Sequence, residues 1–96
     1  MTRDRLQNLR NMICMMQYYE ATVDGHARAL AQLKPRIEEL VAWIENIECP
    51  VAREIIRLRY VRGLNYVQIA HRLDMSSDAA RMTHNRYIKR VDCRAH

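Results

Sequence analysis

One face of a predicted C-terminal helix carries side chains that can form hydrogen bonds with flat, polar groups. Spacings of three and four residues place these side chains on the same side of the helix. The face is formed by Ser77, Asp78, Arg81, Met82, Asn85 and Lys89. An arginine can donate two hydrogen bonds to guanine, and an asparagine can pair in the same manner with adenine. Arg81 and Asn85 therefore make this face a candidate for reading base edges in the major groove of DNA.

Other kinds of chemistry find little support in the sequence. A zinc site needs four converging ligands, usually in paired short spacings, and Cys93 and His96 form one such pair only. We find no glycine-rich phosphate loop, no nucleophile with a recognisable base and no paired acidic motif. We therefore expect no metal, no cofactor and no enzymatic activity, and we expect His84 to be a core histidine.

The charge of the chain is concentrated in its second half. Up to Glu48 there are six basic and seven acidic residues, whereas from Cys49 onward there are ten basic and four acidic ones. The halves thus carry about −1 and +6, a separation typical of a polyanion-binding half next to a segment with another role. From charge alone, the alternative to a polyanion-binding half is a basic surface that contacts only solvent.

Composition indicates a small all-α protein. The chain has 96 residues with two glycines, two prolines and no phenylalanine, and it is rich in residues that favour helices. It has no signal-peptide pattern and no apolar run of roughly 18 residues, so we expect a soluble, cytoplasmic protein. Three cysteines without a pattern are expected to be reduced thiols, with Cys14 on an apolar helix face.

The first 48 residues show the pattern of two amphipathic helices. Apolar residues recur at Leu6, Leu9, Ile13, Met16 and Val23, and again at Ala27, Leu30, Leu33, Ile37, Leu40, Ile44 and Ile47. We expect helices over 2–23 and 26–48 that pair as an antiparallel hairpin around an Asp24-Gly25 turn. Pro35 implies that the second helix kinks or begins there, and the unbroken apolar spacing favours a kink.

Two helices alone enclose little core. Their exposed sides could bury more apolar surface against a second copy of the chain. Residues 1–48 are therefore predicted to be an oligomerisation segment, and the protein is predicted to be a homodimer.

Residues 49–96 are predicted to form a domain of three helices. Pro50 suits the first position of a helix that stops at Gly63. One apolar stripe of this helix is formed by Val51, Ile55, Leu58 and Val61, and a second by Ile56 and Tyr60. The remaining face carries Arg53, Arg57 and Arg59. A helix with this pattern is buried on two sides.

Two further helices are joined by a tight turn. Asn65 can cap a helix from Tyr66 to Leu73, and Ser76 can cap a last helix from Ser77 to about Val91. The second helix of such a pair, when polar and basic on its outer face, fits a major groove about 12 Å wide. Ala70 stands where the two helices must cross closely.

The run from Gly63 to Ser77, GLNYVQIAHRLDMSS, resembles the signature of sigma-factor region-four-like helix-turn-helix domains, G-x-S/N-Y/W-x-x-I-A-x-x-L-x-x-S. The preceding RLRYVRG at 57–63 fits the helix that comes before this signature. The resemblance covers residues 50–91 and implies a domain that binds double-stranded DNA. Small phage and prophage transcriptional regulators place a helical segment before a domain of this kind.

The resemblance also implies roles for individual residues. Base contacts fall on Ser77, Asp78, Arg81, Met82 and Asn85. Phosphate contacts fall on Asn65, Tyr66, Arg72, Arg86 and Lys89. The chain departs from the family pattern at Asp74, where glycine is frequent, and at Ala79 and Ala80, which replace a usual Thr-Val pair. These departures affect the expected sequence preference more than the fold.

The leading hypothesis is a sequence-specific transcription regulator of prophage or mobile-element type. Dimerisation through the hairpin would bring two recognition helices, residues 77–91, to successive major grooves about 34 Å apart. One alternative is an adaptor that docks on RNA polymerase through the near-neutral N-terminal helices. Another is an accessory protein of DNA packaging or recombination.

Overall fold

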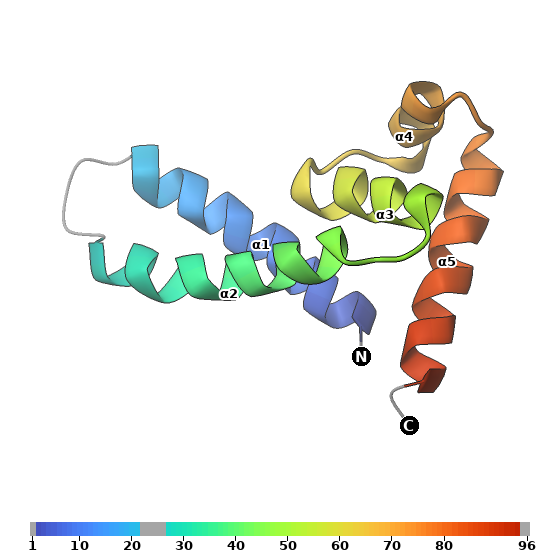
Figure 1. Ribbon diagram of the computed structural model, residues 1–96. Coiled ribbons are helices and arrows are strands. Elements are labelled where there is room, and N and C mark those ends of the chain that lie inside the picture. Colours follow the sequence, from blue (N-terminus) through green and yellow to red (C-terminus); the bar gives the residue numbers. More distant parts are fainter. Residues whose placement is uncertain (1, 22–26, 95–96) are drawn as a thin grey trace.

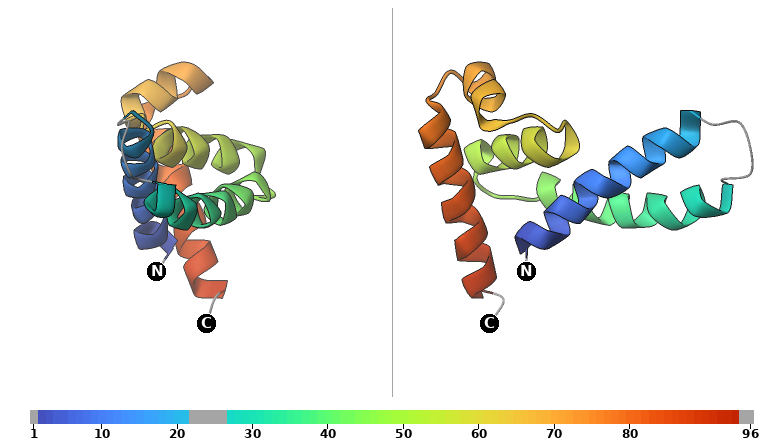
Figure 2. Two further views of the ribbon diagram at one scale, coloured as in Figure 1. Left: turned by 90° about the vertical axis from the view of Figure 1, so that its left-hand side faces the viewer. Right: turned by 180° about the vertical axis from the view of Figure 1, so that it is seen from behind.

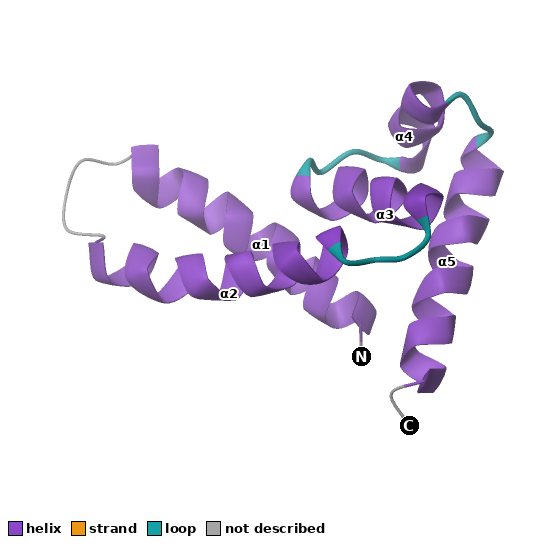
Figure 3. Ribbon diagram, in the orientation of Figure 1, coloured by secondary structure: helices purple, strands orange, loops and turns teal. Residues whose placement is uncertain are grey.

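The computed structural model describes residues 2–21 and 27–94, and every regular element within them is helical (Figures 1 and 3). In chain order the elements are α1 (Thr2–Ala21), α2 (Ala27–Glu45), α3 (Pro50–Ile56), the π-helix η1 (Arg57–Val61), α4 (Tyr66–Leu73) and α5 (Ser77–Arg94). The predicted all-α class is confirmed. The expected Asp24-Gly25 turn lies outside the described residues. Among the described helices, none combines the length and the apolar character that crossing a bilayer requires.

Helices α1 and α2 pair as the antiparallel hairpin expected from the sequence, and the end formed by the last turns of α1 and the first turns of α2 projects away from the other helices (Figure 2). The apolar spacing correctly indicates the buried sides, formed by Leu6, Leu9, Ile13, Ile37, Ile44 and Ile47. Pro35 lies inside α2, so the helix does not begin at this proline. The predicted position of Cys14 on an apolar face is wrong, because this thiol is exposed.

The segment formed by α3 and η1 is buried on two sides, as its two apolar stripes predict. Toward the hairpin, Ala52, Ile56 and Tyr60 join one apolar cluster. Toward α4 and α5, Ile55 and Leu58 join a second cluster. Val51 is predicted in the same stripe as Ile55 and Leu58, but it is 47% exposed and joins neither cluster.

The helix begun at Pro50 widens into a π-helical turn before it stops. The Arg62 N–H donates to the Arg57 carbonyl oxygen over 3.2 Å, which is a bond to the fifth preceding residue. Gly63 follows in the left-handed region with φ +74°, which a residue without Cβ adopts at no steric cost. Arg10 of α1 donates from Nη1 to the Val61 carbonyl oxygen over 2.7 Å and so attaches the hairpin to this helix end.

The start of α1 also contacts the end of α5 (Figure 1). The Thr2 N–H donates to the Asp92 carboxylate over 3.0 Å. Helix α5 continues to Arg94, three residues beyond the predicted end at Val91, and Ile88 belongs to the same cluster as the hairpin core. Residues 1–48 therefore share a core with the helices that follow them.

Candidate nucleic-acid interface

The start of α4 is fixed by a reciprocal pair of hydrogen bonds. The Asn65 Oδ1 atom accepts from the Gln68 backbone N–H over 2.8 Å, and Gln68 Oε1 accepts from the Asn65 backbone N–H over 2.9 Å. This capping box satisfies two backbone donors that the first turn of a helix leaves without partners. The predicted boundaries of α4, Tyr66 and Leu73, are both confirmed.

The turn between α4 and α5 is as tight as the sequence predicts. Asp74 takes the left-handed conformation with φ 55°, where glycine is frequent in the family pattern, and the Met75 N–H donates to the Ala70 carbonyl over 3.0 Å. Ser76 Oγ then accepts from the Ala79 N–H over 3.1 Å and caps α5. Aspartate tolerates the left-handed conformation better than most residues, so Asp74 preserves the turn.

Small and branched apolar residues hold α4 against α5. Ile69 and Ala80 are fully buried together with Ile55, and Ala70 is buried as expected for the crossing point. Ala80 replaces a bulkier family residue, yet the position remains closed to solvent. A packed core of this kind sets the orientation of α5 and lets its outer face act as a rigid surface.

The residues predicted to read bases lie on the outer side of α5. Asp78, Arg81, Met82 and Asn85 are exposed, and Ser77 is half-buried at the first turn. Arg81 donates from Nη2 to Asp78 Oδ1 over 3.1 Å, with both side chains more than half exposed. An exposed pair of this kind contributes little to stability, so Arg81 can leave Asp78 for another partner at small cost.

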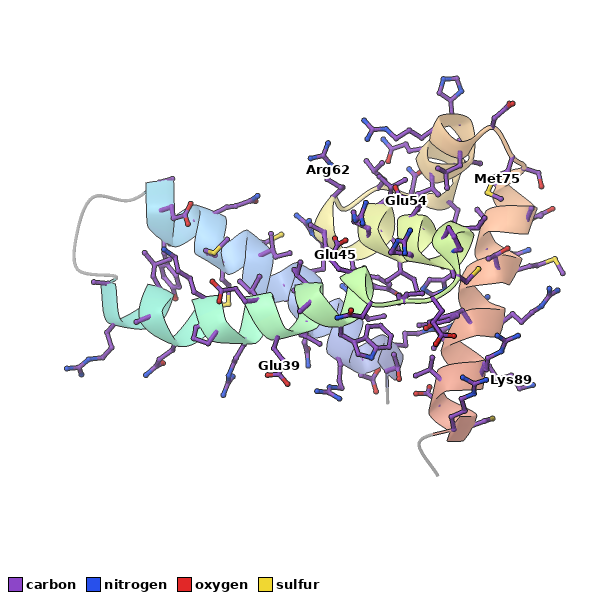
Figure 4. The ribbon with its side chains drawn as sticks, in the orientation of Figure 1. Glu39, Glu45, Glu54, Arg62, Met75 and Lys89 are labelled. Atoms are coloured by element: carbon purple, nitrogen blue, oxygen red, sulfur yellow. The ribbon has the colours of Figure 1, made fainter. Side chains whose placement is uncertain are left out.

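The residues predicted to contact phosphates fall into two groups. Arg72, Arg86 and Lys89 are exposed cations, and Figure 4 shows Lys89 on the C-terminal half of α5. Asn65 and Tyr66, in contrast, already serve the fold. The Asn65 side chain belongs to the capping box, and the Tyr66 hydroxyl lies 3.1 Å from His84 Nδ1.

His84 connects α5 to η1 and α4. Its side chain is 1% exposed, and its Nε2 atom lies 2.7 Å from the Tyr60 hydroxyl. Burial lowers the pKa of His84 and raises the pKa of Tyr60, which keeps both groups neutral near pH 7. The prediction of a core histidine is confirmed. Sequence reasoning missed its tyrosine partners, because no local pattern brings Tyr60, Tyr66 and His84 together.

The arginines of the predicted basic face on α3 and η1 support the fold. Arg57 forms an ion pair with Glu45 of α2 at 2.7 Å and another with Glu54 of α3; Figure 4 labels both carboxylates. Arg53 donates to the Ile47 carbonyl, and the Arg59 guanidinium lies 4.4 Å from the centre of the Tyr66 ring. In contrast, α4 and α5 carry exposed cations that could meet a polyanion, and Arg62, just before α4, is exposed as well.

A metal centre has no support in the parts of the chain that the structure describes. Residues 2–21 and 27–94 bring together no group of three or more histidine, cysteine, aspartate or glutamate side chains. His96, which with Cys93 forms the one short spacing that was weighed against a zinc site, lies outside these residues.

Residues 50–91 match the family model of Sigma-70, region 4. No curated protein and no solved structure was found to match the chain. The matched region begins at the first residue of α3 and ends in the last turn of α5, so it contains the capping box, the turn and the exposed face described above.

Proposed function

Because residues 50–91 form a sigma-70 region 4 helix-turn-helix domain, which is a DNA-binding unit, we propose that the protein is a sequence-specific transcription regulator that reads the major groove with α5. The observation that carries this proposal is the exposed polar face of α5 on a rigidly packed helix pair. We further propose the prophage or mobile-element type, because a helical segment before such a domain resembles the architecture of those regulators.

The proposed division of labour follows the chemistry of each side chain. Arg81 donates two hydrogen bonds to guanine once it leaves Asp78, and Asp78 accepts from cytosine. Met82, 54% exposed, contacts a thymine methyl group. Ser77 reaches the groove at the first turn of α5. Asn85 adds hydrogen bonds further along the same face.

Cations on both helices supply affinity that does not depend on sequence. Arg72, Arg86 and Lys89 neutralise phosphates. Asn65 and Tyr66, at the start of α4, contact the sugar-phosphate backbone of the DNA. Neutralising three phosphates should give a slope of about −3 in a plot of log affinity against log salt for one copy, and about −5 for two copies. Fluorescence anisotropy with a labelled random duplex at several salt concentrations measures this slope. Affinity that does not change with salt would contradict the proposal.

The projecting end of the hairpin is the proposed dimer contact. Met15 is 46% exposed and Tyr18 is 63% exposed, although both are apolar or aromatic residues of α1. Pairing of this surface with a second copy would present two α5 helices to successive major grooves. Sedimentation should give a dimer for the wild type and a monomer for Tyr18→Glu, whereas Gln7→Glu, with the same charge change at an exposed polar position, should stay dimeric. A monomeric wild type would contradict the dimer and favour docking of this surface on RNA polymerase.

A further inference from the structure

The carbonyl oxygen of Asn85 is already engaged within the protein. Arg3, in the first turn of α1, donates from Nη2 to Asn85 Oδ1 over 2.8 Å, although the residues are 82 positions apart in the chain. His84 Nδ1 lies 3.0 Å from the same oxygen. The hairpin thus reaches the exposed face of α5 and contacts a residue predicted to read bases.

The donors and acceptors around His84 are compatible with one arrangement of protons. A guanidinium only donates, so the Asn85 atom that faces Arg3 must be the oxygen. The same oxygen requires a proton on His84 Nδ1, which leaves Nε2 of the neutral ring as an acceptor. Tyr60 must then donate its hydroxyl proton to Nε2 across the 2.7 Å contact. The Tyr66 hydroxyl, 3.1 Å from Nδ1, can share the Nδ1 proton as a second acceptor.

The surroundings of His84 keep this ring neutral. Burial has the largest effect and lowers the pKa of His84, and the cations of Arg3 from α1 and Arg59 from η1 act in the same direction. The hydrogen bond with Asn85 opposes them but is outweighed. Because the His84 ring does not bind a second proton near pH 7, the chain of hydrogen bonds from Arg3 through Asn85 and His84 to Tyr60 keeps the same donors and acceptors.

We propose that Arg3 is a specificity-determining residue of DNA recognition: together with His84 it occupies the Asn85 carbonyl oxygen, so that Asn85 offers DNA its amide N–H donors and selects guanine or thymine. Pairing with adenine needs the same oxygen to accept from N6–H while the amide donates to N7. Both lone pairs of the oxygen already have donors in the protein. Guanine and thymine present hydrogen-bond acceptors at their major-groove edges. The Asn85 NH2 group can donate to these acceptors without breaking the contact between Arg3 and the Asn85 oxygen.

This inference rests on the proposed function, since it assigns a preference to one position on the reading face of α5. It replaces the sequence-based expectation that Asn85 pairs with adenine. It also makes the hairpin part of the reading surface, in addition to its proposed role in dimerisation.

The arrangement of protons can be tested without DNA. Nitrogen-15 NMR of the imidazole rings in the full chain distinguishes a ring protonated on Nδ1 from one protonated on Nε2. The wild type should show His84 protonated on Nδ1, and Arg3→Ala should shift the population toward Nε2. Arg5→Ala is the matched control, because Arg5 carries the same charge on the same helix but lines a different cavity beside α2, so it should leave the signal unchanged. A wild-type His84 protonated mainly on Nε2 would overturn the inference.

Selection of bound sequences from a random duplex pool tests the preference itself. The position that Asn85 reads is the one whose preference disappears in Asn85→Ala. At that position the wild type should enrich guanine or thymine, and Arg3→Ala should raise the relative frequency of adenine about fivefold or more, since one bidentate pair discriminates by at least about that factor. Arg5→Ala should retain the wild-type preference.

The outcomes separate this inference from the proposed function. Adenine enriched by the wild type at the Asn85 position, with other positions also enriched, would refute the role of Arg3 alone. Absence of any enriched sequence for the wild type would refute the proposed function and the inference with it, even if the NMR experiment finds the Nδ1 proton.

Discussion

Replacing His84 with phenylalanine should destabilise the protein through two tyrosine hydroxyls. The phenyl ring keeps the shape of the buried side chain but removes both ring nitrogens. Tyr60, which is 4% exposed and also accepts a hydrogen bond from the Arg59 side chain, then holds a hydroxyl proton that has lost its acceptor, at a cost of about 1–3 kcal/mol. Tyr66 is half-buried and can bond to water, so its loss is at most about 1 kcal/mol. We expect His84→Phe to lower the free energy of unfolding by about 1–4 kcal/mol.

Urea unfolding followed by circular dichroism measures this loss, and an unchanged dependence on urea concentration shows that the comparison is valid. The matched control is Tyr60→Phe in both backgrounds. Because replacing both partners of a hydrogen bond with apolar groups is close to neutral, Tyr60→Phe should cost less in His84→Phe than in the wild type, by about 1–2 kcal/mol. Two results would refute the reasoning: stability losses of His84→Phe and Tyr60→Phe that simply add in the double variant, or a His84→Phe variant within about 0.5 kcal/mol of the wild type.

Three further predictions follow from the same contacts. Because burial lowers the pKa of folded His84 below its ordinary value of 6.5, the unfolded chain binds the proton first. The stability that the wild type has over His84→Phe should therefore be fully present above about pH 6.5 and decline as the pH falls toward the folded pKa, measured by urea unfolding at several pH values. Gly63→Ala should cost about 1–2 kcal/mol, since alanine must adopt φ +74° and its Cβ would lie 3.0 Å from Arg10 Cζ; thermal unfolding checks this, and an unchanged melting temperature would contradict it. Lys89→Ala should weaken binding to all duplexes alike and reduce the salt slope by about one for each copy that binds, measured by anisotropy; a loss limited to one sequence would show that Lys89 reads bases.

Local signals predicted the helix-turn-helix accurately. Asn65 and Gln68 form a capping box from residues three positions apart, and Ser76 caps α5 in the same local way, so both helix starts follow from the sequence. Asp74 could adopt the left-handed conformation without help from distant residues. Hydrophobic spacing likewise indicated the buried sides of the hairpin, because it is a property of each helix alone.

Features that depend on tertiary contacts were not accessible in this way. The π-helical turn after Ile56 lies between two apolar clusters, and the two apolar stripes of the segment predict burial on both sides but not the widened turn. Helix α5 passes its predicted end where Asp92 accepts from Thr2, a residue 90 positions earlier. The contact between Arg3 and Asn85 likewise joins the two ends of the chain. No pattern of types and spacings identified Arg3 as a neighbour of the reading face.

The central claim is that α5 distinguishes one DNA sequence from others. It is tested most directly by measuring, at one salt concentration, the affinity for the duplex enriched from a random pool and for a scrambled duplex of the same composition. We predict that the wild type prefers the enriched duplex by at least about 10³-fold, and that Arg81→Ala reduces this preference by about 5- to 150-fold while leaving affinity for the scrambled duplex nearly unchanged. Equal wild-type affinity for both duplexes, or a preference that survives Arg81→Ala intact, would contradict the account.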